Sequence, residues 1–171
     1  MFVKTKPYFR LMKRILFTRH AKSSWANAGM SDHDRPLNER GLSNAQLLSV
    51  EMNSEFEKVQ EVYVSSAKRA QETAQHLNLN PAKMKTFKAL YTFDYRALLN
   101  FIKEMDSSYN YIQIVGHNPA ITEFVNSYSN ARIDNVPTCG MVLIEWKEAE
   151  KWSEIEDVFG KLLMFNTPKR Y

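Results

Sequence analysis

Apolar runs of strand length recur along the chain. Ile, Leu, Val, Phe and Tyr, which favour strands, dominate these runs, which lie at residues 15–18, 62–65, 111–115, 141–146 and 161–165. A further short strand is expected near residues 85–87. The first and third runs are apolar at nearly every position, which predicts strands that are buried on both faces of a sheet.

Amphipathic helices are predicted between these strands. Apolar side chains recur there at spacings of three and four, which is the period of a helix that buries one face. The four groups are Leu42, Ala45, Leu48 and Met52; Ala70, Thr73, Ala74 and Leu77; Tyr95, Leu98, Leu99, Ile102 and Met105; and Ile121, Phe124 and Val125.

The alternation of strands and helices predicts a single-domain, three-layer α/β/α sandwich. Right-handed crossovers between successive strands give a mainly parallel sheet with helices on both faces. The runs at 141–146 and 161–165 are separated by a polar stretch, so we expect them to pair as an antiparallel edge. No repeat or linker rich in Gly and Pro divides the 171 residues, which suit one domain.

The charge of the chain is concentrated at its two ends. The 23 Lys and Arg residues exceed the 19 Asp and Glu residues, which gives a formal net charge of +4. Five of the basic residues and none of the acidic ones lie in residues 1–11 and 169–171, so 18 basic and 19 acidic residues remain between them. A basic groove for nucleic acid is therefore not indicated. We expect residues 1–11 to be a disordered N-terminal extension and residues 12–171 to form the folded domain.

Cysteine and histidine usage argues against disulfides and a structural metal. Cys139 is the only cysteine, so no intramolecular disulfide can form, and the four histidines lack zinc-site spacing. The N-terminal stretch has no apolar segment typical of a signal peptide, and no run of 18 or more apolar residues would span a membrane. We therefore expect a cytoplasmic protein.

Basic and histidine side chains follow three of the predicted strands. Arg19 and His20 come directly after the first strand, Arg69 lies shortly after the second, and His117 follows the third. Ligands of a parallel sheet bind beyond the carboxyl ends of its strands, where these residues would meet. Two arginines and two histidines at one edge predict a site for an oxyanion, with phosphate as the best match.

The same residue types favour phosphoryl transfer to a histidine. A neutral histidine nitrogen can attack phosphorus in line while nearby cations stabilise the equatorial oxygens. Arg19, Arg69 and His117 supply the positive charge that Mg²⁺ would otherwise bring, so we expect neither a metal nor another cofactor. The chain has no Gly-x-x-x-x-Gly-Lys loop and no Asp-x-Asp pair at a strand end. The sequence therefore lacks the motifs that P-loop and aspartyl-phosphate enzymes require.

Four segments share a pattern with a known family. Their sequences are LFTRHAKSSW (16–25), DHDRPLNERG (32–41), SSAKRAQETA (65–74) and VGHNPAITEF (115–124). In this order they resemble the histidine phosphatase superfamily, and most of all its small branch of phosphohistidine phosphatases. The resemblance implies the phosphoglycerate-mutase-like fold.

The resemblance also implies roles for individual residues. His20 would accept the phosphoryl group, Arg19 and Arg69 would hold its oxygens, and His117 would complete the pocket and stabilise the transition state. Arg35 would lie near the pocket mouth and contact substrate.

The sequence departs from the superfamily in two places. Ala21 and Lys22 stand where many relatives have Gly and Glu, whereas Ala and Lys are common in the phosphohistidine branch. Mutases and larger phosphatases carry an acid that protonates the leaving oxygen; Asp94 is the nearest candidate here, and its alternative role is a carboxylate at a helix N-terminus. A site without an acid suits phosphohistidine, because an imidazole that is already protonated leaves as a neutral base.

These observations favour a metal-independent phosphatase that forms a covalent phosphohistidine on His20 and acts on phosphohistidine in a partner protein. Two alternatives stay open. One is a phosphomonoesterase for a small metabolite or phosphoserine, with Asp94 as its acid, and the other is a non-catalytic phosphate-binding domain. The expected partner is a phosphorylated protein or a small phosphorylated molecule, with no nucleic acid and no membrane.

Overall fold

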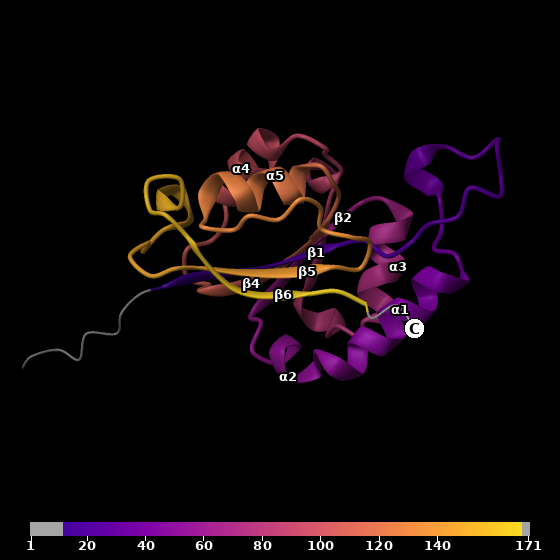
Figure 1. Cartoon of the computed structure of the whole chain (residues 1–171), viewed down its shortest axis with the longest axis horizontal. Coiled ribbons are helices and arrows are strands. Elements are labelled where there is room, and N and C mark those ends of the chain that lie inside the picture. Colours follow the sequence, from indigo (N-terminus) through magenta and orange to yellow (C-terminus); the bar gives the residue numbers. More distant parts are fainter. Residues whose placement is uncertain (1–11, 169–171) are drawn as a thin grey trace, which may run out of the picture.

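Six strands form one sheet. The computed structural model of the chain describes residues 12–168, so the extension predicted for residues 1–11 lies outside the described residues. All the predicted strands are confirmed, and the sheet order is β3-β2-β4-β1-β5-β6 (Figure 1). The strands are β1 (Lys13–Arg19), β2 (Glu61–Ser65), β3 (Met84–Phe87), β4 (Tyr111–Gly116), β5 (Met141–Trp146) and β6 (Lys161–Asn166).

The sheet is parallel from β3 to β1 and reverses at β5. Strand β5 runs antiparallel to β1, and β6 runs antiparallel to β5, so the expected antiparallel pair is confirmed. The reversed strand is β5, and the outermost strand β6 again follows the direction of the parallel strands. The chain after the last helix returns to the carboxyl ends of the parallel strands before β5 begins, which sets Met141 opposite Thr18.

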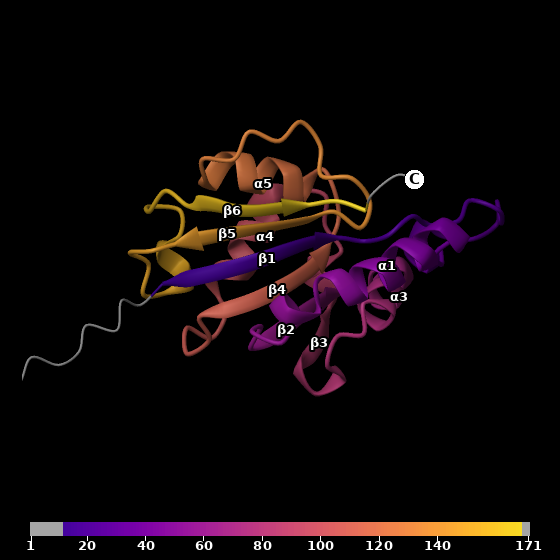
Figure 2. The same cartoon turned by 60° about the horizontal axis from the view of Figure 1, so that its bottom comes forward.

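Helices cover both faces of the sheet, and the three-layer sandwich is confirmed. On one face lie α1 (Glu39–Glu51), the short α2 (Asn53–Phe56) and α3 (Lys68–His76), and on the other lie α4 (Tyr95–Lys103) and α5 (Ala120–Tyr128) (Figures 1 and 2). Alternate residues of β1 serve the two cores: Phe17 packs in the cluster with α4 and α5, and Leu16 packs in the cluster with α1 and α3. No helix within residues 12–168 is long and apolar enough to cross a membrane.

The carboxyl ends of the central strands lie in register. Arg19 at the end of β1 is paired with Gly116 at the end of β4, and Val64 of β2 is paired with Val115 of β4. The backbone N–H of His20 donates to the carbonyl oxygen of Gly116 at 3.0 Å, which continues the pairing one residue beyond β1. Side chains that follow these strands therefore emerge at one edge of the sheet.

Candidate active site

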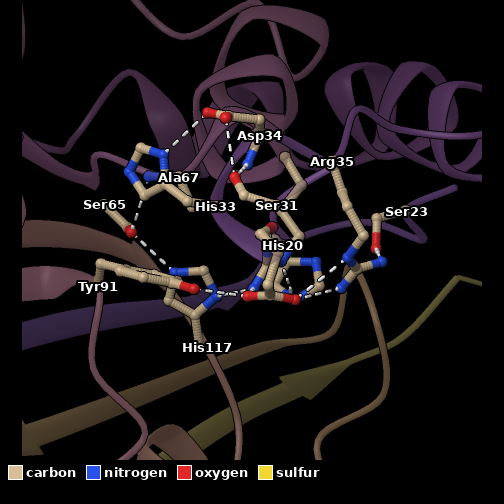
Figure 3. A network of polar contacts seen from close by, with 12 residues as sticks. His20, Ser23, Ser31, His33, Asp34, Arg35, Ser65, Ala67, Tyr91 and His117 are labelled. Carbon is tan, nitrogen blue, oxygen red and sulfur yellow. Dashed lines mark hydrogen bonds and ion pairs between the residues drawn. The ribbon is translucent and has the colours of Figure 1, made fainter. Parts of the chain in front are cut away.

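An open pocket of about 510 Å³ lies at this edge. Its wall includes Arg19, the last residue of β1; His20, the next residue; and Arg69, in the first turn of α3. His117 follows β4 directly and lies behind this wall, with 1% of its surface exposed. The rings of His20 and His117 are 5.2 Å apart between centroids (Figure 3). With Arg19 and Arg69 in the pocket wall, the structure brings together the four residues predicted from the strand ends.

The ring of His20 is held in one tautomer. Its Nδ1 atom lies 2.8 Å from the carbonyl oxygen of Ala21, and because a carbonyl can only accept, Nδ1 carries the proton. The other nitrogen, Nε2, accepts a hydrogen bond from Nε of Arg69 at 3.2 Å. Burial, followed by the positive charges of the surrounding arginines, lowers the pKa of His20 to about 3. At neutral pH the ring is therefore neutral with a lone pair on Nε2, which is the state of a histidine nucleophile.

The guanidinium of Arg69 connects both histidines with the loop after β1. Besides its bond to His20, it donates from Nη1 to the carbonyl oxygen of Asp32 at 2.6 Å and from Nη2 to the Asp32 carboxylate at 3.0 Å. Nη2 also lies 3.4 Å from Nδ1 of His117. Only 2% of Arg69 is exposed; it lies in the first turn of α3 and contacts Asp32 of this loop. A fixed planar fork of donors thus lies beside the reactive nitrogen of His20.

His117 supports Arg69 from behind. Since Arg69 can only donate, Nδ1 of His117 must accept, and Nε2 then donates to the hydroxyl oxygen of Ser65 at 2.7 Å. Burial, followed by nearby His20 and Arg69, lowers the pKa of His117 to about 2. His117 is therefore neutral at neutral pH. It is also not among the residues that line the pocket.

Arg19 keeps donors for a ligand. Its Nη1 atom donates to the carbonyl oxygen of Val136 at 2.8 Å, which fixes the side chain at the pocket wall. Its Nε atom is buried and has no hydrogen-bond partner among residues 12–168. A half-buried cation with an unused donor favours the binding of an anion.

A carboxylate that the sequence analysis gave no role lies in the pocket wall. One oxygen of Asp32, Oδ2, accepts from the hydroxyl of Tyr91 at 2.6 Å and from Arg69, and the other, Oδ1, accepts from Nε and Nη2 of Arg35 at 3.1 and 2.9 Å. Burial alone would raise the pKa of Asp32, but the hydrogen bonds from Tyr91 and Arg35 and the charge of Arg69 hold it well below its usual range. Asp32 is therefore ionised at neutral pH.

Arg35 and Trp25 lie together in the pocket wall. Arg35 is only 7% exposed and also donates to the hydroxyl of Ser23 at 2.6 Å (Figure 3). Its guanidinium carbon lies 3.6 Å from the ring centroid of Trp25. Trp25 is 73% exposed and lines the pocket. Arg35 thus lies in the pocket wall, and its contact with substrate stays a prediction.

Asp94 does not line the pocket, although its neighbour Phe93 does. It caps α4, where its carboxylate accepts the backbone N–H of Arg96 at 2.8 Å, which is the alternative role considered for it. The structure does not bring Asp94 together with His20 in the pocket wall. Across residues 12–168, His, Cys, Asp and Glu side chains nowhere gather in a group of three or more that could hold a metal ion.

Thr73 positions the segment that carries His20. Its hydroxyl accepts the backbone N–H of Ala21 at 2.9 Å and donates to the carbonyl oxygen of Arg69 at 2.6 Å. In the sequence Thr73 fits the apolar face of a helix, so its polar contacts are not visible there. Its place four residues after Arg69, and hence one turn along the same helix face, is the only signal.

Gly41 allows α1 to approach the same segment. A Cβ atom at this position would lie 2.1 Å from the carbonyl oxygen of Lys22, which itself accepts the backbone N–H of Asn38 at 2.9 Å. No side chain therefore fits between the first turn of α1 and the backbone that follows His20.

We expect Gly41→Ala to destabilise the fold by about 1–3 kcal/mol, because the methyl group must displace backbone rather than a flexible side chain. Thermal unfolding measures this as a midpoint several degrees lower. Gly29→Ala is the matched control, since the nearest atom to its added Cβ is a side-chain oxygen at 3.6 Å. Equal midpoints for the two variants would contradict the close approach.

Two further contacts of the site were missed in the sequence. Asp32 precedes Arg35 by three residues, a spacing that lets both side chains meet across a turn. This spacing is visible in the segment DHDRPLNERG (32–41). Tyr91 follows the short strand β3 and carries no local signal.

Comparisons with known proteins agree with this geometry. The model of the histidine phosphatase superfamily (branch 1) matches residues 15–98, which include Arg19, His20, Asp32 and Arg69. An uncharacterized protein of Mycobacterium leprae is 27% identical over 163 residues, covering 88% of this chain and 99% of its own. An uncharacterized chloroplastic protein of Arabidopsis thaliana is 27% identical over 160 residues, covering 84% of this chain and 73% of its own.

Solved structures share the fold. The protein histidine phosphatase SixA in complex with tungstate superposes with a TM-score of 0.73 at 17% identity, covering 91% of this chain and 97% of that one. A mycobacterial glucosyl-3-phosphoglycerate phosphatase superposes with a TM-score of 0.60 at 12% identity, covering 89% and 97% of the two chains. The solved structures thus share the fold over about nine-tenths of the chain. Because the family model matches residues 15–98, which hold the first three of the four segments, this part of the chain belongs to the histidine phosphatase superfamily.

Proposed function

We propose that the protein is a phosphatase that removes the phosphoryl group from phosphohistidine in a partner protein. In the first step, Nε2 of His20 attacks phosphorus, and the P–N bond of the substrate breaks with its electron pair on the leaving nitrogen. In the second step, water attacks the phosphorus of phospho-His20, the bond to Nε2 breaks, and inorganic phosphate leaves. Arg19 and Arg69 hold the phosphoryl oxygens in both steps.

The state of His20 carries this proposal. A ring whose Nδ1–H is bound to the Ala21 carbonyl and whose Nε2 faces Arg69 needs no deprotonation before it attacks. The same Arg69 donor that now binds Nε2 lies where an oxygen of a phosphoryl group on Nε2 would accept it. Nucleophile and charge stabilisation thus come from two neighbouring side chains.

The pocket suits a leaving group that brings its own proton. Asp32 is the only acidic residue that lines the pocket within the described part of the chain, and it is ionised, so it cannot act as a general acid. An alkoxide would leave poorly from such a site, whereas the imidazole of a protonated phosphohistidine leaves as a neutral base. The shared fold with a structure named protein histidine phosphatase SixA supports the same substrate class.

A comparison of two substrates tests the proposal. We expect kcat/KM for phosphate release to be at least about tenfold higher with a phosphohistidine peptide than with an alkyl phosphomonoester, because only the peptide supplies the leaving-group proton. Excess EDTA is expected to change neither rate, since Arg19, Arg35 and Arg69 provide the positive charge at the pocket. The His20→Ala protein serves as the blank.

Three results would contradict parts of the proposal. Preference for the ester would favour the phosphomonoesterase, for which a proton donor must then be found outside the present pocket wall. Loss of activity in EDTA, restored by Mg²⁺, would overturn the assignment of charge to the arginines. Stoichiometric phosphate binding without turnover of either compound would favour the non-catalytic phosphate-binding domain.

A further inference from the structure

The Asp32 carboxylate has no role in the two steps above, yet it lines the same pocket as His20 and is bound by the same arginine, Arg69. The Nε and Nη2 atoms of a guanidinium lie on the same edge of its plane. Arg69 donates from Nε to Nε2 of His20 and from Nη2 to Oδ2 of Asp32. The nucleophilic nitrogen and the carboxylate oxygen are therefore bound by one guanidinium, and both residues line the pocket.

A phosphoryl group at His20 would compete with Asp32 for this edge. Its oxygens carry more negative charge than a carboxylate and would take over the Arg69 donors. Asp32 would still be held, because Arg35 binds Oδ1 with two nitrogens and Tyr91 donates to Oδ2. The carboxylate would then remain at the pocket wall, with one acceptor position of Oδ2 released.

The negative charge of the Asp32 carboxylate decides which leaving group the released Oδ2 atom favours. The hydrogen bonds from Tyr91 and Arg35 and the charge of Arg69 keep the pKa of Asp32 low, so Oδ2 accepts a proton donor and gives none. It attracts a leaving ring that carries positive charge and an N–H on the nitrogen that is not bonded to phosphorus. It repels the negative charge that develops on the oxygen of a departing phosphate ester.

We propose that Asp32 is a specificity-determining residue that accepts the N–H of the protonated leaving ring and thereby selects phosphohistidine over phosphate esters. This inference rests on the proposed function. The ring enters with a proton on the nitrogen that carries no phosphoryl group. When the P–N bond breaks, the electron pair stays on the leaving nitrogen, and a neutral imidazole departs with its single N–H bound to Oδ2.

The proposal predicts a pH effect. Asp32 raises the pKa of the bound ring, and only the protonated ring leaves readily, so activity toward phosphohistidine is lost as pH rises through that pKa. Without the carboxylate that pKa is lower, and the alkaline limb of kcat/KM moves to lower pH. A shift of about one pH unit corresponds to a tenfold change in rate on that limb.

The test is Asp32→Asn, which keeps the size of the side chain and an oxygen for Arg35 but removes the charge. We expect the ratio of kcat/KM for a phosphohistidine peptide to that for p-nitrophenyl phosphate to fall at least about tenfold, together with the shift of the alkaline limb. The rate with p-nitrophenyl phosphate should stay constant or rise, since its leaving oxygen needs no proton. Asp32→Glu, which keeps the charge, should retain most of the preference.

Asp34→Asn is the matched control. Asp34 belongs to the same short turn (Asp32–Asp34), is exposed, and does not line the pocket, so the ratio should not change. An equal loss on both substrates in Asp32→Asn would assign Asp32 to the support of the arginines and overturn the proposal. An unchanged ratio would overturn it as well. A wild-type enzyme without preference for the peptide would instead overturn the proposed function, so the two failures are distinguishable.

Discussion

Replacement of His20 by alanine is expected to reduce phosphate release by at least about 10⁴-fold, with either a phosphohistidine peptide or p-nitrophenyl phosphate as substrate. The reason is that the variant has no atom in place of Nε2 to form the covalent intermediate, and water in the pocket is a poorer nucleophile than a positioned imidazole. Steady-state phosphate release with purified protein measures the loss.

A trapping experiment separates this explanation from a general loss of structure. Brief mixing with radiolabelled substrate should label the wild-type protein with a phosphoryl group that is lost in acid and retained in alkali, as expected for a phosphoramidate, and His20→Ala should remain unlabelled. His76→Ala is the matched control, because His76 lies in the last turn of α3 and does not line the pocket. Label retained on His20→Ala would show that another residue accepts the phosphoryl group.

The position of the site could be predicted from the sequence because it depends on strand ends. Apolar runs are readable as strands, parallel strands end at one edge, and Arg19, His20 and His117 follow such runs directly. The position of Arg69 could also be predicted, since a helix that begins just after β2 must start at the same edge of the sheet. These four placements need only local pattern and one rule of topology.

The contacts around Asp32 could not be predicted in the same way. The segment between β1 and α1 has no apolar periodicity, so its path over the pocket is set by tertiary contacts, such as that between Asp32 and Arg69. Tyr91 reaches Asp32 only because of where the chain leads after β3, a short and half-exposed strand at the sheet edge. Such contacts join residues 59 positions apart in the chain and leave no local signal.

The buried position of His117 also depends on packing. Its place after β4 predicts that it reaches the site. The sequence does not indicate which side chains lie between His117 and the pocket. Arg69 and the rings of Tyr91 and Phe93, whose centroids lie 5.4 and 5.6 Å from that of His117, cover it. In this arrangement His117 acts on a bound phosphoryl group through Arg69. Replacement of Arg69 should therefore lower the activity more than the loss of a single contact with phosphate would.

Replacement of Arg69 by alanine is accordingly expected to lower kcat/KM for the phosphohistidine peptide by about 10²–10⁴-fold, or about 3–5 kcal/mol of transition-state stabilisation. The affinity for inorganic phosphate, measured by calorimetry, should fall in the same variant. The change removes the donors beside Nε2 of His20 and leaves the neighbouring Asp32 carboxylate without one of its cations.

Arg69→Lys distinguishes the shape of the donor from its charge. Lysine keeps the positive charge but cannot donate to Nε2 and to a second acceptor from one planar edge, so we expect at least about a 10²-fold loss to remain. Because Arg69 is buried, circular dichroism and thermal unfolding of both variants must show a folded protein, and exposed Arg40→Ala should behave as wild type. Full activity in Arg69→Lys would mean that charge alone suffices. Full activity in folded Arg69→Ala would remove Arg69 from the proposed mechanism and leave Arg19 and Arg35 to hold the phosphoryl group.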